Sequence, residues 1–144
     1  MASFQKFNSF VEALAEKKHD LGTDTLKVML TNTAPNSATA AKYSDVAGSN
    51  EVAAGNGYTT GGNAAAVTSS VQTGGTYKLV LGDPATWSAA GGSIGPFRYA
   101  VLYNDSAPNK ELIGFWDYGS SITLAAGESF AVDFDPTTGV LTIV

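Results

Sequence analysis

The pattern of apolar and polar positions changes from a helical period to a strand period near residue 25. Apolar side chains in the first segment recur at the spacing of one helix face, at Phe7, Phe10, Val11 and Leu14. Ser9 followed by Glu12 is typical of a capping box, and Gly22 is suited to ending a helical segment. We therefore predict a short helix over 9–19 within an N-terminal segment that spans 1–22.

From residue 25 onward, apolar positions alternate with a period of two, which is typical of strands with one buried face. In Thr25–Thr31 this alternation puts Leu26, Val28 and Leu30 on one face. The same pattern predicts strands over 64–72, 76–81, 97–103, 112–118, 121–124, 129–134 and 140–144, with shorter candidates at 51–54 and 86–89. Residues 32–49 are predicted to form a surface loop.

The many short strands predict an all-β chain, built as an antiparallel sandwich or a closed barrel. No helical pattern separates the strands, so parallel βαβ units are excluded. Glycines crowd residues 55–62 and predict tight turns with positive φ. The side chains that we expect to face the core of the two most aromatic strands are Phe97, Tyr99, Val101, Phe130, Val132 and Phe134.

Length and composition restrict the possible functions. The chain has 144 residues, of which 44% are hydrophobic and 15% charged, and it fits a single domain over 1–144. The net charge is −5, and residues 79–144 hold two cations against seven anions. We therefore expect no nucleic-acid partner, because phosphate binding needs a basic surface. No apolar run approaches the length of a membrane span or a signal sequence, so we expect no membrane partner.

Candidate chemistry is sparse. The absence of cysteine excludes disulfides and thiolate sites. Gly91–Gly95 matches the G-x-S-x-G elbow of serine hydrolases, but Pro96 and a predicted strand follow it where the elbow needs a helix. His19 is the only histidine and cannot build the usual zinc site alone. Asp133 and Asp135 are interpreted as turn residues, with a weak calcium site as the alternative. We expect no catalytic residue and no cofactor.

Two apolar groups are candidate interaction sites. Trp116 and Tyr118 lie opposite Phe115 in phase, and an exposed pair beside Asp117 could stack on a sugar or anchor a partner, although burial in an oligomer interface fits equally. The second group is the apolar stripe of the N-terminal segment, formed by Phe4, Phe7, Phe10, Val11 and Leu14. We predict that this stripe contacts a partner. In the alternative, the helix covers one open end of its own sandwich.

Four segments resemble a family of small virion proteins of tailed bacteriophages: FNSFVEALAEKKHDLGTDTLKVMLTNTAP (7–35), AAGNGYTTGG (53–62), GGSIGPFRYAVLYND (91–105) and LIGFWDYGSSITLAAGESFAVDF (112–134). The resemblance covers nearly the whole chain, including its start, so we expect a complete small protein. It implies a single antiparallel β sandwich of jelly-roll type with one short N-terminal helix, an architecture common in viral capsids.

The implied function is non-enzymatic. A capsid decoration, or cement, protein would bind the major capsid protein on the outer head surface and stabilise the shell against internal DNA pressure. We expect a dimer or trimer, since symmetric self-association is common in such proteins. Assembly would take place in the host cytoplasm, and the final location would be the virion surface. The alternative is a tail-tip or fibre module that binds a host-surface glycan, since jelly rolls also serve as lectins.

Overall fold

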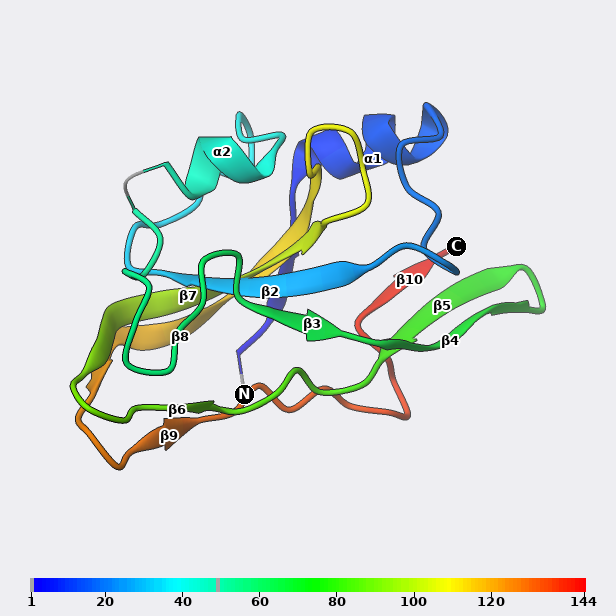
Figure 1. The fold of residues 1–144 in the computed structure, drawn as a ribbon. Coiled ribbons are helices and arrows are strands. Elements are labelled where there is room, and N and C mark those ends of the chain that lie inside the picture. The colour runs from blue at the N-terminus through cyan, green and yellow to red at the C-terminus, as the bar shows by residue number, and fades with distance from the viewer. Residues whose placement is uncertain (1, 49) are drawn as a thin grey trace.

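The computed structural model describes residues 2–48 and 50–144, which form three antiparallel sheets and two short helices (Figure 1). The prediction of an all-β chain with antiparallel sheets is confirmed. The helices are α1 (Asn8–Ala15) and α2 (Tyr43–Val46). The strands are β1 (Phe4–Lys6), β2 (Leu26–Thr31), β3 (Asn63–Ala65), β4 (Val67–Thr73), β5 (Thr76–Leu81), β6 (Trp87–Ser88), β7 (Ile94–Asn104), β8 (Leu112–Leu124), β9 (Ser129–Phe130) and β10 (Leu141–Ile143).

The largest sheet has five strands in the order β1-β8-β7-β2-β3. Its centre is the hairpin of β7 and β8, in which Val101 pairs with Phe115. β2 runs antiparallel to β7 and pairs Met29 with Val101. β1 pairs with β8 and forms one edge of the sheet, so its outer side has no strand beside it within this sheet.

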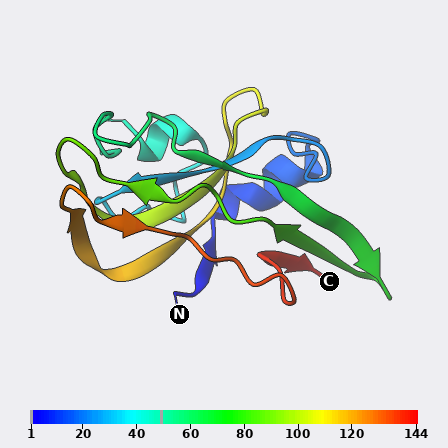
Figure 2. The ribbon, with the colours of Figure 1, turned by 60° about the horizontal axis from the view of Figure 1, so that its bottom comes forward.

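The smaller sheets, β10-β5-β4 and β6-β9, lie along one face of the five-stranded sheet (Figures 1 and 2). Between the layers is the main core, where β2 and β5 meet through Leu26, Val28, Leu30, Leu79 and Leu81. The face predicted for β2 is therefore confirmed. A second cluster, on the opposite face of the five-stranded sheet, includes Met29, Tyr103 and Leu112 with Val46 of α2. The central strands are thus buried on both faces.

The N-terminal segment differs from the prediction in its boundaries. α1 ends at Ala15, and Lys17 follows in the left-handed region with φ 65°. The amide of Lys18 donates to the carbonyl of Ala13 at 2.9 Å, which closes the last turn. Ser9 donates its hydroxyl to the carbonyl of Ala40 at 3.0 Å and caps no helix amide, so the predicted capping box is wrong. Residues that precede the helix form β1, which the periodicity did not predict.

Two other predicted segments are also revised. The loop expected over 32–49 contains α2 and buries Val46 and Ala47 against the second cluster, while Ser49 lies outside the described residues. The strands expected at 112–118 and 121–124 are one strand, β8, in which residues 118–121 bulge out of the ladder with β7 and Gly119 takes a φ of 102°. The glycines predicted to take positive φ do so: Gly55, Gly57, Gly61 and Gly62.

The predicted inward faces are correct for one strand and wrong for part of another. Phe130, Val132 and Phe134 pack against the main core, as expected. In β7 the register shifts between Phe97 and Tyr99, and this irregularity puts the two rings on opposite faces. Phe97 therefore faces the main core, whereas Tyr99 and Val101 face the second cluster.

Candidate functional site

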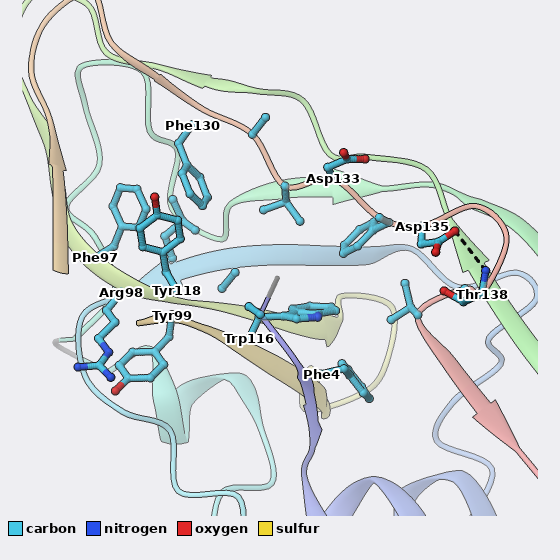
Figure 3. Close-up of a pocket in the computed structure, with 18 residues that line it drawn as sticks. Phe4, Phe97, Arg98, Tyr99, Trp116, Tyr118, Phe130, Asp133, Asp135 and Thr138 are labelled. Carbon is cyan, nitrogen blue, oxygen red and sulfur yellow. Dashed lines mark hydrogen bonds between the residues drawn. The ribbon is translucent and has the colours of Figure 1, made fainter. Parts of the chain in front are cut away.

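A groove of about 350 Å³ opens between the edge of the five-stranded sheet and the segment 130–140 (Figure 3). We call it the aromatic groove. Core residues Leu30, Phe97 and Ala100 form its floor. Its walls and rim include Phe4, Trp116, Tyr118, Phe130, Val132, Phe134 and Val140. A concave, largely apolar site with a few polar groups at its rim is typical of binding sites in proteins.

β1 and β8 supply one wall of the aromatic groove. The Phe4 ring lies 5.1 Å from the Trp116 ring, measured between centroids, and Phe134 approaches Trp116 at 5.3 Å. Trp116 is therefore half-buried between two aromatic neighbours. Phe4 can reach this position because Gly114, which pairs with Lys6, has no side chain where the ring lies.

Tyr118 forms the exposed end of the groove. Its side chain is 57% exposed, and its ring meets Phe130 edge-on at a centroid distance of 5.9 Å. Trp116 and Tyr118 lie on the face of β8 opposite Phe115, as their phase predicted. Of the two, only Tyr118 presents most of its ring to solvent.

Asp117, between these two aromatic residues, is already paired. Arg98 donates Nε to Oδ1 at 2.7 Å and Nη2 to Oδ2 at 2.9 Å, and the amide of Gly119 donates to Oδ1 at 2.8 Å. The Arg98 guanidinium lowers the pKa of the Asp117 carboxyl below its usual value. A platform of Trp116, Asp117 and Tyr118 would thus offer a sugar no unpaired carboxylate.

The carboxylates of the C-terminal segment have different surroundings. Asp135 accepts hydrogen bonds from the amides of Thr137 at 2.7 Å and Thr138 at 3.2 Å, and these bonds lower its pKa. This is the turn chemistry that the sequence predicted. Asp133 is exposed at the rim, and no described residue bonds or pairs with its side chain. Nowhere in residues 2–48 and 50–144 do three or more His, Cys, Asp or Glu side chains gather where they could hold a metal ion.

The N-terminal stripe is divided between the interior and the surface. Phe7 and Phe10 are 0% and 3% exposed, and Phe7 packs against Phe115 at 5.2 Å between centroids. The prediction that these two residues contact a partner is therefore wrong. The alternative, in which the helix covers its own sandwich, fits Phe10 in the main core, whereas Phe7 precedes α1 and packs in the second cluster. The reason is that pairing of β1 with β8 brings the start of α1 against the five-stranded sheet, which buries Phe7 and Phe10.

The remaining members of the stripe lie at a second groove beside the first. Val11 is 54% exposed, and Phe4 and Leu14 are half-buried. Together they line a groove of about 520 Å³ with the C-terminal residues 140–144, where Val144 is fully exposed. Phe4 and Val140 line both grooves, so the apolar surface runs from Tyr118 to the end of the chain.

His19 belongs to a separate buried polar cluster. Its Nδ1 lies 3.0 Å from Asn104 Nδ2, and Asn104 also donates to Asp24 Oδ2 at 2.6 Å. Burial lowers the pKa of His19, although the charges of Glu111 and Asp24 act in the opposite direction. Ser93 is followed directly by β7, as expected for a plain turn. The hydrolase elbow, which needs a helix there, does not form.

The sequence named Phe4, Trp116 and Tyr118 but did not bring them together with residues 130–140. The alternation of Phe130, Val132 and Phe134 indicated that these side chains share one face. It did not indicate that this face lies against Trp116 and Tyr118 of β8.

Comparison with protein-family models, with curated proteins and with solved structures found no match for this chain. Among the described residues, no helix combines the length and the apolar character needed to cross a membrane.

Proposed function

We propose that the chain is a non-enzymatic virion protein of a tailed bacteriophage that decorates the outer head surface and stabilises the shell. The resemblance of four long segments to small phage virion proteins supports the biological setting. The aromatic groove supports the mode of action, because it provides a preformed apolar surface on a rigid β framework. The major capsid protein is the proposed partner, and assembly would occur in the host cytoplasm.

The observation that carries the proposal is the continuous apolar surface from Tyr118 through Phe4 to Val144. Of the five large hydrophobic side chains that are exposed among the described residues, Tyr118, Val11, Ile143 and Val144 lie along it, and Val71 on β4 is the exception. Such patches normally contribute most of the energy of protein contacts, with aromatic residues dominating. A dimer or trimer on the shell would use other surfaces, so that each copy keeps its groove available for the capsid.

A jelly-roll arrangement is the finer description that we propose for the fold. It is supported by the way in which chain segments alternate between layers. β2 and β3 belong to the five-stranded sheet, β4 to β6 to the small sheets, β7 and β8 to the large sheet again, and β9 and β10 to the small ones. Alternation of this kind is typical of Greek-key sandwiches.

The glycan-binding alternative has weaker support. A sugar that stacks on Trp116 or Tyr118 would find Asp117 held by Arg98 and Asp135 by backbone amides, so that Asp133 is the one carboxylate lining the groove that has no described partner. Trp116 is also covered on its sides by Phe4 and Phe134. The apolar floor fits protein side chains better than it fits hydroxyl groups.

Binding to phage heads tests the proposal. Heads prepared without the chain are mixed with purified wild-type protein and sedimented, and Tyr118→Ala is compared with Val71→Ala. Both side chains are largely exposed, but Val71 lies on β4 outside both grooves. We expect saturable binding of wild type and of Val71→Ala, with affinity at least tenfold lower for Tyr118→Ala. Binding to host cell envelopes that free sugars abolish, with no binding to heads, would establish the glycan alternative instead.

A further inference from the structure

Residues 130–134 have the burial pattern of a strand but lack a complete ladder. Phe130 and Val132 are half-buried and Phe134 is buried, while Ala131 and Asp133 between them are exposed. The ladder with β6 nevertheless ends at the pair of Phe130 with Trp87. The sequence predicted a strand through residue 134, so this segment has the side-chain pattern of a strand without a neighbour along its open edge.

Backbone directions identify which groups face that edge. The carbonyl of Glu128 accepts from the amide of Ala89 at 2.9 Å, and the amide of Phe134 donates to Asp83 Oδ1 at 2.7 Å. Backbone groups of alternate residues in an extended strand point to opposite sides. The carbonyl of Glu128 therefore points toward β6, and the amide of Phe134 points toward the segment before β6. If the backbone alternates between them, the N–H and C=O groups of Ala131 and Asp133 point to the open edge. No described residue bonds to these four groups.

This open edge runs along the aromatic groove. Ala131 and Asp133 line the groove, and Trp116 and Tyr118 line it from β8 on the opposite side (Figure 3). An extended polypeptide placed there would receive backbone hydrogen bonds from the edge and would bury alternate side chains against the rings. Addition of a strand to an open edge is a recurring mode of peptide recognition.

The charge at the rim specifies the occupant further. Asp133 has no described partner, and Asp135 adds a second carboxylate nearby. Arg98 pairs with Asp117, and Lys78, which donates Nζ to the carbonyl of Thr137 at 2.9 Å, acts on Asp135, so the charge of Asp133 is left without a described counterion. The rim is therefore acidic, and the whole chain carries a net charge of −5. A second copy would bring a further −5, whereas a basic segment complements the site.

We propose that the aromatic groove binds an extended segment of the partner, with alternating apolar residues flanked by lysine or arginine, along the edge of residues 131–133. This inference rests on the proposed function for its partner, the major capsid protein, but the recognition chemistry is tested without it. The probe is a ribosome-displayed library of random 12-residue peptides, selected on the purified full-length chain.

Two pairs of variants test the backbone hydrogen bonds at the edge of residues 131–133 and the negative charge at the rim of the groove. Ala131→Pro removes one outward amide and Ala131→Thr keeps it. Asp133→Lys reverses the rim charge, and Glu12→Lys makes the same change at an exposed site of α1 outside the groove. We expect selected peptides to carry alternating apolar residues and a terminal basic residue. Their affinity should fall at least tenfold with Ala131→Pro and with Asp133→Lys, and stay within twofold for both controls.

The outcomes separate the two proposals. Failure to select any peptide, or selection of acidic peptides insensitive to Asp133→Lys, would overturn the inference even if the chain binds phage heads. Peptides with the expected pattern would support it even if head binding fails and the capsid role is wrong. If Ala131→Pro does not fold, methylation of the peptide's own amide nitrogens tests the same hydrogen bonds. Two peptides are compared, one methylated at the odd-numbered and one at the even-numbered amides, and we expect a tenfold loss of affinity in only one of them.

Discussion

The ring of Phe4 lies where a side chain at Gly114 would have to be. This close approach holds β1 on β8 and puts Phe4 into the wall of the aromatic groove beside Trp116. The edge strand and the groove therefore depend on one glycine near the start of the long strand β8.

Gly114→Ala should displace Phe4 and loosen β1. We expect a loss of about 1–3 kcal/mol in the free energy of unfolding, as for other overpacked sites. Urea denaturation measures the loss. Gly82→Ala is the matched control, since a methyl group there meets Thr68 at an ordinary 3.5 Å, and it should change stability by less than about 0.5 kcal/mol. Equal effects of the two substitutions would show that Phe4 does not depend on Gly114.

The two halves of the N-terminal stripe should respond differently to truncation. Phe10 is 3% exposed and Val11 is 54% exposed, although they are neighbours on α1. Phe10→Ala should cost about 3–5 kcal/mol, because it removes buried surface and leaves a cavity. Val11→Ala should stay within about 0.5 kcal/mol. Thermal or urea melts compare them, and a stable Phe10→Ala protein would restore the view that this face of the helix serves a partner.

The sequence predicted most strands and their inward faces because burial on one side imposes a period of two. It predicted Leu26, Val28 and Leu30 on the core face of β2 correctly. It placed Tyr99 and Val101 wrongly, on the same face as Phe97, because a register shift in β7 reverses the phase between Phe97 and Tyr99. Periodicity carries no sign of such an irregularity, which depends on how the partner strand is paired.

The N-terminal stripe shows a second limit of the sequence pattern. Spacing indicated which side chains share a helix face, but it could not indicate what covers that face. The helix face is covered by the sheet because β1 docks on β8, with the Phe4 ring over Gly114. These two residues are far apart in the sequence. In the same way, Phe130 and Val132 were predicted to be inward, whereas the groove that they form with Trp116 and Tyr118 arises only when β8 and residues 130–134 face each other.

Glu51 should stabilise the chain through a set of hydrogen bonds. Its carboxylate accepts from the hydroxyl groups of Tyr43 and Tyr58 and, at 2.6 Å, from the amide of Gly61. Burial is the larger cause, and contact with Glu51 the second, of a raised pKa of Tyr43. Its hydroxyl group therefore stays protonated and donates the hydrogen bond. Glu51→Ala should lower the free energy of unfolding by about 2–3 kcal/mol, because it removes charge-assisted bonds and leaves donors unpaired.

Chemical denaturation measures that loss, and Glu16→Ala serves as the control because Glu16 lies exposed at the end of α1. A change below about 0.5 kcal/mol at Glu51 would show that water replaces these bonds at no cost.

Protonation of His19 should destabilise the fold in mild acid. Burial beside the Phe10 ring, at 5.2 Å, lowers the pKa of His19 below its unfolded value of 6.5, against the opposing charges of Glu111 and Asp24. The unfolded chain then binds more protons than the folded chain, so stability falls as the pH drops below about 6.5. We expect the free energy of unfolding to decrease from pH 7.5 to pH 5.

His19→Gln isolates this contribution from that of the carboxylates. The difference in unfolding free energy between wild type and His19→Gln should shrink or reverse as the pH is lowered through 6.5 toward 5. A difference that is constant over this range would mean that His19 titrates equally in both states.

The central claim is that the chain attaches to the outside of a phage head through the aromatic groove. A cryo-electron microscopy reconstruction of virions, compared with virions that lack the chain, tests it most directly. The account predicts additional density on the outer head surface, fitted by this fold with Tyr118 and residues 131–133 facing the major capsid protein. Density on the tail, or on the head with the groove facing solvent, would contradict it.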